Sequence, residues 1–194
     1  MLNYDLTLAS ASPRRAEILT QIGVNFRASP AEIDETPKSN ESAVDYVQRM
    51  ALEKVNRVLK TESYSKPVLG SDTTVVFDSI ILGKPQDADD ATRMLSMLSG
   101  STHQVLTAVV VSDGTECQSL LSKTEVRFRT ISIKECQTYW QTGEPQDKAG
   151  AYAIQGYGAV FVESIRGSYS GVVGLPIAET TQLLQQFNIP IWQY

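Results

Sequence analysis

Apolar residues recur along the chain at two spacings, and each spacing predicts one kind of element. Apolar positions three and four residues apart predict amphipathic helices. We expect these helices from Pro13 to about Gly23, from about Ser42 to Lys60, after Asp87 up to Ser99, from Ser132 to Gly143, and after Pro176 up to Phe187. Shorter apolar or alternating runs predict extended segments and strands. They cover Asp5–Ala9, Val24–Ala28, Pro67–Phe77, Ile80–Leu82, His103–Ser112, about Glu116–Arg129 and Ala159–Ile165.

Local signals mark where several of these elements begin and end. Ser12 followed by Pro13 is a typical helix start, and Ser132 with Glu135 three residues later is a capping box. Asp113-Gly114 predicts a hairpin turn between two long strands. The glycine-rich stretch 143–158 predicts loops packed against a ligand or a neighbouring backbone. Hairpins mixed with helices, without an obvious linker, favour one α/β domain over residues 1–194 with a mixed sheet.

Composition limits the chemistry to consider. The 194 residues include 17 Lys and Arg against 22 Asp and Glu, a formal net charge of −5. This charge argues against binding a nucleic-acid polymer, which relies on bulk positive charge and counterion release. One His and two Cys are too few for a zinc site with about four such ligands. Any phosphate chemistry must therefore be local, and carboxylates are the remaining metal ligands.

The expected location is the cytoplasm. Cys117 and Cys136 form no C-x-x-C pair and are most simply two inert thiols in a reducing compartment. The first residues lack the basic and apolar regions of a leader peptide, and no apolar run approaches about 18 residues. We therefore expect no contact with a membrane.

The segment Ser10–Arg15 could form an anion site. It combines the end of a strand, two hydroxyls, a helix N-terminus and two guanidinium groups. Any capped helix with solvated arginines would give the same pattern, so both interpretations stay open.

Two acidic segments are candidates for catalysis or metal binding. Asp72 directly follows an apolar strand, where an open α/β sheet often presents a functional carboxylate, although a bulge or cap residue would look the same. Glu32, Asp34 and Glu35 form an acidic loop that could be solvated, or could join a second loop around a hard cation such as Mg²⁺.

Three basic or titratable residues have ambiguous patterns. Lys54 lies within the long helix and is typical of a surface residue, while Lys84 lies in a Gly-Lys-Pro turn whose fixed backbone would aim its amine. His103, within a strand, is expected to be structural, and no second histidine is available.

Taken together, several segments resemble the Maf family of nucleoside triphosphate pyrophosphatases in order and spacing. These segments are 8–15 (LASASPRR), 32–35 (EIDE), 69–73 (LGSDT), 83–85 (GKP), 147–152 (DKAGAY), 154–156 (IQG) and 172–176 (VVGLP). The resemblance covers nearly the whole chain. It implies an α/β fold with an elongated mixed sheet flanked by helices and a central cleft, similar to inosine triphosphate pyrophosphatases. It also implies release of pyrophosphate from a nucleotide with a divalent cation, Mg²⁺ or Mn²⁺, and suggests a homodimer.

Residues that distinguish the family's branches point to dTTP and UTP as substrates. Arg14, Thr73 and Gln155 match the branch that hydrolyses these two nucleotides, whereas the 7-methyl-GTP branch has an aromatic residue and a glutamine at the first two positions. Ser71 and Ala153 depart from the pyrimidine branch, which usually has alanine and glycine there. The alternatives are 7-methyl-GTP hydrolysis and a nucleotide-binding regulator of septum formation that arrests cell division.

The resemblance also implies a role for each matching residue. Ser10, Arg15, Lys54 and Lys84 would bind the phosphates, and Glu35 and Asp72 would hold the metal. Asp72 would also accept the proton of the attacking water. Arg14, Thr73 and Gln155 would set substrate specificity, which would extend to modified pyrimidine triphosphates.

Overall fold

A long, mixed β-sheet runs through the molecule, and its long central strands are paired in antiparallel orientation. In the computed structural model, which describes residues 4–61 and 66–193, the strand order is β2-β1-β3-β5-β6-β7, with β4 paired to β3. The strands are β1 (Leu6–Leu8), β2 (Phe26–Ala28), β3 (Val68–Phe77), β4 (Ile80–Leu82), β5 (Thr102–Ser112), β6 (Cys117–Phe128) and β7 (Val162–Arg166). β1 pairs in parallel with β2 and β3, and the other pairs are antiparallel.

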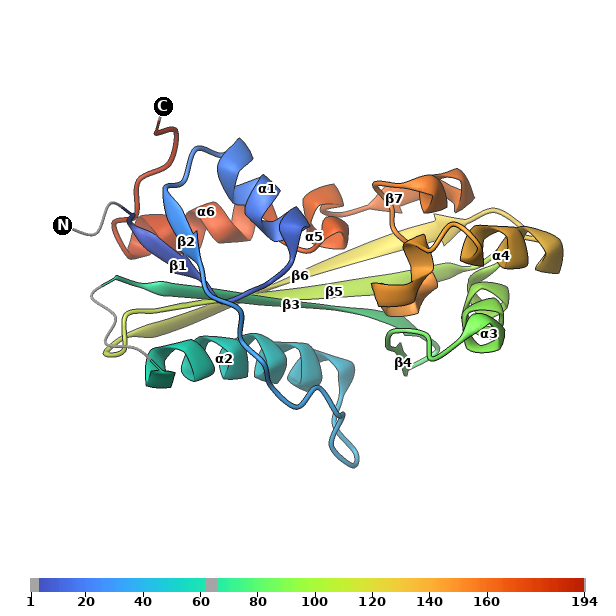
Figure 1. Cartoon of the computed structure of the whole chain (residues 1–194), viewed down its shortest axis with the longest axis horizontal. Helices are drawn as coiled ribbons and strands as arrows, with labels where there is room; N and C mark the ends of the chain where they lie inside the picture. The colour runs from blue at the N-terminus through green and yellow to red at the C-terminus, as the bar shows by residue number, and fades with distance from the viewer. Residues whose placement is uncertain (1–3, 62–65, 194) are drawn as a thin grey trace.

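Helices cover both faces of this sheet. They are α1 (Pro13–Gln21), α2 (Ala43–Thr61), α3 (Ala88–Leu98), α4 (Ile133–Trp140), α5 (Tyr169–Val173) and α6 (Ile177–Gln186). α2 lies alone along one face of β3 and β5, whereas α1, α5 and α6 lie on the opposite face, and α3 and α4 lie at the end of the molecule far from both termini (Figure 1). The architecture confirms the predicted α/β class, with an elongated mixed sheet flanked by helices.

Two apolar clusters hold these layers together. One cluster joins the apolar face of α2 to the sheet through Val47, Ala51, Val55, Val58, Val68 and Leu106, among others. The second and larger cluster lies on the other face and extends to α3 and α4 through buried residues such as Leu95, Leu98 and Phe128. The functional side chains described below emerge between these two cores.

Most local signals in the sequence correspond to the observed element boundaries. Asp87 caps α3 by accepting a hydrogen bond from the Asp90 amide, and the Ser132–Glu135 capping box starts α4. Ser12 occupies the N-cap position of α1, but its side chain makes no capping hydrogen bond. Instead, the Ser10 hydroxyl accepts a hydrogen bond from the Ser12 amide at 3.1 Å.

Two expectations for the last third of the chain were wrong. The strand expected at Ala159–Ile165 begins only at Val162, because a 3₁₀ turn, η3 (Tyr157–Phe161), occupies the preceding residues. The strand also ends one residue later than expected, at Arg166. The glycine-rich stretch also contains the 3₁₀ segments η1 (Glu144–Asp147) and η2 (Ala149–Ala151). The short helix α5 was not predicted.

The part of the chain that the structure describes contains no helix long and apolar enough to cross a membrane. The N-terminal residues 1–3, part of the segment predicted to lack leader character, lie outside the described residues.

Candidate active site

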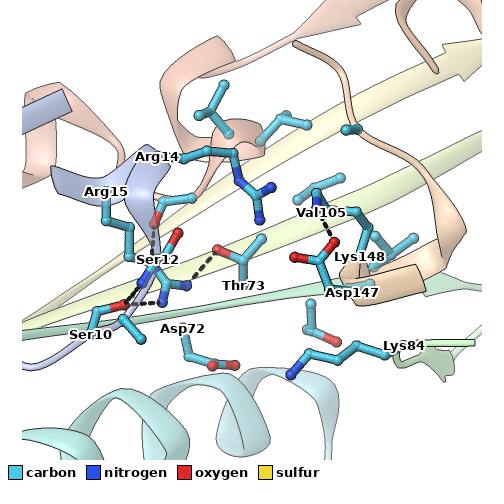
Figure 2. Close-up of a pocket in the computed structure, with 18 of the residues that line it drawn as sticks. Ser10, Ser12, Arg14, Arg15, Asp72, Thr73, Lys84, Val105, Asp147 and Lys148 are labelled. Carbon is cyan, nitrogen blue, oxygen red and sulfur yellow. Dashed lines mark hydrogen bonds and ion pairs between the residues drawn. The ribbon is translucent and has the colours of Figure 1, made fainter. Parts of the chain in front are cut away.

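The segments that carry the candidate residues meet in one open cavity of about 420 Å³, above the middle of β3. Its walls come from the start of α1, the loop before α2, the centre of β3, the turn after β4, and residues 147–155 and 172–174. All of the predicted site residues line it: Ser10, Arg14, Arg15, Glu35, Lys54, Asp72, Thr73, Lys84 and Gln155. Several of them are seen pointing into a common space (Figure 2). The sheet and helices therefore bring together residues that are up to 145 positions apart in the sequence.

Arg15 is fixed in place by three acceptors. Its Nε donates to the carbonyl of Gly174 at 2.9 Å, and its Nη1 donates to the Ser10 hydroxyl at 3.2 Å. A longer contact of 3.5 Å joins its Nη2 to the Thr73 hydroxyl. Burial lowers the pKa of Arg15, and the nearby Asp72 acts in the opposite direction. Guanidinium groups nevertheless stay protonated in proteins, so Arg15 presents a pre-oriented positive charge to the cavity.

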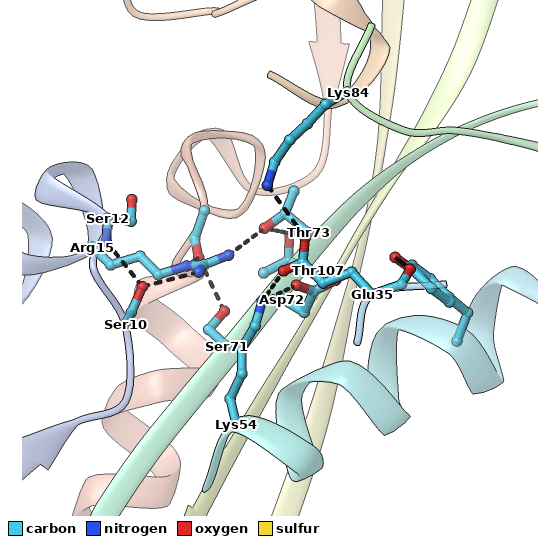
Figure 3. Close-up of polar contacts among 12 residues, drawn as sticks. Ser10, Ser12, Arg15, Glu35, Lys54, Ser71, Asp72, Thr73, Lys84 and Thr107 are labelled. Carbon is cyan, nitrogen blue, oxygen red and sulfur yellow. Dashed lines mark hydrogen bonds and ion pairs between the residues drawn. The ribbon is translucent and has the colours of Figure 1, made fainter. Parts of the chain in front are cut away.

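A chain of alternating charges crosses the floor of the cavity. Lys54 is buried, and its Nζ contacts Asp72 Oδ1 at 2.6 Å and Glu35 Oε1 at 3.0 Å. Glu35 Oε2 contacts the exposed Lys84 at 3.2 Å, so the chain runs from Asp72 through Lys54 and Glu35 to Lys84 (Figure 3). Lys54, which the sequence pattern favoured as a surface residue, thus joins both acidic candidates.

The two carboxylates of this chain differ in their surroundings. Burial raises the pKa of Asp72, and the positive charges of Lys54 and Arg15 oppose this effect without cancelling it. Burial also acts to raise the pKa of Glu35, but Lys54 and Lys84 outweigh it and hold that pKa below its ordinary value. Asp72 is therefore a stronger base than an exposed aspartate, and Glu35 is a weaker base than an exposed glutamate.

The three expected specificity residues do not lie at one point. Thr73 pairs with Thr107 in the sheet register, and their hydroxyls lie 3.0 Å apart. The Thr107 hydroxyl also lies 2.8 Å from the Gly171 carbonyl. Because the Thr73 hydroxyl contacts Arg15 as well, it belongs to the hydrogen-bond network around Arg15. Arg14 and Gln155 line the cavity from α1 and from the loop before η3.

Several residues in the cavity or beside it were given no role in the site from the sequence. Ser71 donates to the Gly174 carbonyl at 3.0 Å. The same carbonyl accepts the hydrogen bond from Arg15 Nε. Tyr46 donates to the Glu35 carbonyl at 2.9 Å, and Lys148 pairs with Asp147 at the cavity wall. Asp147 and Lys148 lie in a segment that matched the family pattern, so a signal for them was present. Glu32 and Asp34, by contrast, do not line the cavity.

The acidic residues suit a divalent cation that keeps part of its water shell. Glu35 and Asp72 converge on one cationic group, Lys54 Nζ, from two separate segments. No group of three or more His, Cys, Asp or Glu side chains in residues 4–61 and 66–193 could by itself hold a metal ion. Mg²⁺ is commonly held by one or two carboxylates together with waters and substrate phosphates. The residues present therefore fit such an ion when a phosphate ligand is also bound.

The sequence matches one family model and the relatives given below. The family model described as Maf-like protein matches residues 5–187. Proteins named dTTP/UTP pyrophosphatase from Pseudoalteromonas atlantica and Pasteurella multocida are 51% and 48% identical to the chain. The first alignment covers 95% of this chain and 97% of the relative, and the second covers 99% and 100%.

The structural comparison is weaker. The solved structure of the Staphylococcus aureus Ham1 protein aligns with a TM-score of 0.46 and 11% identity, over 64% of this chain and 71% of that one.

Proposed function

Because the chain belongs to the Maf family, we propose that it is a nucleoside triphosphate pyrophosphatase that converts dTTP and UTP to the monophosphate and pyrophosphate. The relatives from Pseudoalteromonas atlantica and Pasteurella multocida, both named dTTP/UTP pyrophosphatase, support this choice of substrates. The observation that carries the proposal is the buried Asp72 beside Lys54, at the floor of a cavity whose walls hold Arg15 and Lys84.

The reaction requires one bond to form and one to break at the α-phosphorus. A water oxygen attacks that phosphorus, and the bond to the oxygen that bridges the α- and β-phosphates breaks, which releases pyrophosphate. Asp72 accepts the proton that the water loses. In the free protein, burial holds the pKa of Asp72 above its ordinary value.

Positive side chains offset the charge of the substrate. A triphosphate carries about four negative charges, and cleavage requires these charges to be held while water attacks in line. Arg15, Lys54 and Lys84 supply three cations around the cavity, with the Ser10 hydroxyl beside Arg15. Because Arg15 is already fixed by Gly174 and Ser10, it loses little freedom when a phosphate binds.

We propose that Glu35 and Asp72 hold a divalent cation, Mg²⁺ or Mn²⁺, in the substrate complex. Such an ion neutralises phosphate charge and makes a bound water more acidic. Lys54, which contacts both carboxylates in the free protein, can turn to the phosphates once the carboxylates have this second cation.

Recognition of the base is proposed for Arg14, Thr73 and Gln155. The Gln155 amide can both donate to a pyrimidine carbonyl and accept from its N–H, which suits uracil and thymine. The Thr73 hydroxyl lies close to Arg15, so its part in specificity would depend on how it orients the phosphates as well as on the base. Modified pyrimidine triphosphates that keep this N–H and carbonyl edge would also be substrates.

We also propose that the protein works in the cytoplasm, where its nucleotides are found. Cys117 and Cys136 are both free thiols, which suits a reducing compartment. A homodimer stays a prediction from the family resemblance.

The decisive experiment is a substrate panel measured by pyrophosphate release. The purified protein is incubated with Mg²⁺ or Mn²⁺ and each common triphosphate, together with 7-methyl-GTP. We expect turnover of dTTP and UTP in preference to the others. Turnover of 7-methyl-GTP alone would assign the protein to the 7-methyl-GTP branch of the family. Binding of dTTP without turnover would favour a nucleotide-binding regulator.

Asp72→Asn tests the assignment of the proton acceptor. The amide keeps the size of the carboxylate and lacks its charge and basicity, so we expect kcat for dTTP to fall by about 10³-fold or more. Lys54 keeps Glu35 as a partner in this variant, so the protein should remain folded. Activity near that of the wild type would contradict the role of Asp72.

A further inference from the structure

The loop that carries Gln155 lies between two anchored segments. Ala153, Ile154 and Gln155 line the cavity, whereas residues 156–158 turn away into η3. Before the loop, the buried Tyr152 places its hydroxyl 2.9 Å from His103 Nε2. The Gln155 side chain is exposed, so contacts elsewhere must determine where it points.

Glu144 and Tyr139 form hydrogen bonds with the backbone of this loop, and neither side chain lines the cavity. Glu144 Oε1 accepts a hydrogen bond from the Gly158 amide, and Oε2 accepts one from the Tyr157 amide, both at 2.9 Å. The Tyr139 hydroxyl donates to Glu144 Oε1 at 2.5 Å and accepts from the Ala153 amide at 3.1 Å. Two side chains thus engage backbone groups on both sides of Ile154-Gln155-Gly156.

Two glycines let this pair approach the loop closely, because a side chain at either position would displace the Glu144 carboxylate or the Tyr139 hydroxyl. A Cβ atom at Gly156 would lie 1.8 Å from Glu144 Oε2, and one at Gly158 would lie 2.6 Å from the Tyr139 hydroxyl. The Tyr139 ring packs edge to face on Phe161, with ring centroids 5.1 Å apart. The contacts therefore fix the loop backbone to one position relative to α4.

We propose that Glu144 and Tyr139 are positioning residues that set the selectivity for pyrimidine triphosphates by holding the Gln155 loop. The proposal rests on the proposed function, because it assigns the loop to recognition of the base. Neither residue lines the cavity. Their effect on catalysis must act through the loop, and it should concern the base and leave the phosphate half of the site unchanged.

Tyr139→Phe is the mildest test of this pair. It removes only the hydroxyl and keeps the ring that packs on Phe161. We expect KM for dTTP to rise about tenfold with kcat within about twofold, because the lost contacts position the base and not the reacting phosphorus. The ratio of kcat/KM for dTTP to that for dATP should fall by a similar factor.

Substitutions at Glu144 give a graded series. Glu144→Gln keeps the side-chain length and leaves one acceptor oxygen for three donors, so it should have an intermediate effect. Glu144→Ala removes all the acceptors and should have the largest effect. Inhibition by inorganic tripolyphosphate probes the phosphate half alone, and its inhibition constant should stay within about twofold in every variant.

Glu135→Gln is the matched control for a purely structural role. Glu135 lies in α4, as Tyr139 does, and accepts hydrogen bonds from Ser132 and Arg129, in a network that does not line the cavity. Its substitution should lower the melting temperature and leave selectivity unchanged. If the Tyr139 and Glu144 variants also lose only stability, or weaken tripolyphosphate binding as much as dTTP binding, the proposal is wrong.

Amide hydrogen exchange separates this proposal from the proposed function. In Tyr139→Phe and Glu144→Gln, exchange should become faster at residues 153–158 and stay unchanged in β3 and β5. This measurement does not require that the protein hydrolyse dTTP. An inactive wild type would defeat the proposed function, whereas unchanged exchange in the loop would defeat the positioning role.

Discussion

Lys54 shows how burial gives a common residue type a specific use. A lysine in a long helix is normally solvated, but here its ammonium group lies between Asp72 and Glu35 beneath the cavity. Its position was in fact encoded in the pattern, because Lys54 follows Ala51 by three residues and precedes Val58 by four, and both lie on the buried face of α2. A charged residue on an apolar face therefore indicates an interior partner.

His103 illustrates the opposite case, a titratable residue with a structural role. It is buried, packs edge to face on Phe128 and Tyr152, and its Nδ1 has no hydrogen-bond partner. Burial lowers the pKa of His103 to about 4. The structural role expected from the sequence fits these surroundings.

This histidine should make stability depend on pH. An unfolded histidine titrates near pH 6.5, so between pH 6.5 and 4 the unfolded chain binds a proton that the folded protein excludes. The free energy of unfolding should therefore fall by about 2 kcal/mol from pH 7 to pH 5. Urea unfolding at the two pH values measures this change. His103→Gln, which cannot titrate, should flatten the dependence, and an equally steep dependence in that variant would refute the assignment.

At the scale of elements, local sequence signals predicted the helix caps and turns, which depend only on residues close together in the sequence. The caps at Asp87 and Ser132 and the turn at Asp113-Gly114 act over a few residues, and the structure contains each of them. The segment after Gly143 could not be predicted in this way, because its 3₁₀ turns depend on the contacts between Glu144 and the distant residues Tyr157 and Gly158.

The close approach of α2 to β3 places Lys54 beside Asp72. Gly70 and Asp72 lie on the same face of β3, since alternate residues of a strand share a face. A Cβ atom at Gly70 would lie 2.6 Å from the Ala51 carbonyl and 2.7 Å from a methyl group of Val55. These two residues flank Lys54 on α2, so the absence of a side chain at Gly70 lets Lys54 reach Asp72.

Gly70→Ala should therefore reduce both stability and activity. Overpacking of this kind costs about 1–3 kcal/mol, which corresponds to a fall of roughly 3–10 °C in melting temperature for a domain of this size. Movement of α2 would also draw Lys54 from Asp72 and lower kcat. Gly83→Ala is the control for stability, because a Cβ atom there meets nothing within 4 Å. Equal melting temperatures for the two variants would contradict this account of the helix–sheet contact.

At the scale of the whole molecule, the site forms only when distant segments meet. The acceptors of Arg15 alone come from Ser10, Thr73 and Gly174, which lie on three separate elements or loops. Family motifs predicted which segments contribute, but spacing along the chain could not predict that the Gly174 carbonyl would receive both Arg15 and Ser71. That contact depends on the packing of α5 on β5 and β6, which brings Gly174 to Ser71 of β3.

The charge balance of the assembled cavity should make metal binding depend on the nucleotide. The five lining cations outnumber the three lining carboxylates by two charges, so the free cavity has little need of another cation; these residues are Arg14, Arg15, Lys54, Lys84 and Lys148, and Glu35, Asp72 and Asp147. A triphosphate adds about four negative charges and reverses this balance. We therefore expect Mg²⁺ alone to change the melting temperature by less than about 1 °C. Mg²⁺ with a non-hydrolysable α,β-imido analogue of dTTP at about 100 times its Kd should stabilise the protein by ~2.7 kcal/mol.

Thermal unfolding with and without a chelator measures this dependence. For a domain of this size, the stabilisation corresponds to a rise of roughly 5–10 °C in melting temperature, and EDTA should remove most of it. Glu35→Gln should make the shift insensitive to EDTA, because it removes one of the two carboxylates while Lys54 keeps Asp72. A large shift with Mg²⁺ alone would show that the carboxylates bind the ion before the nucleotide arrives, and that Lys54 does not compensate their charge.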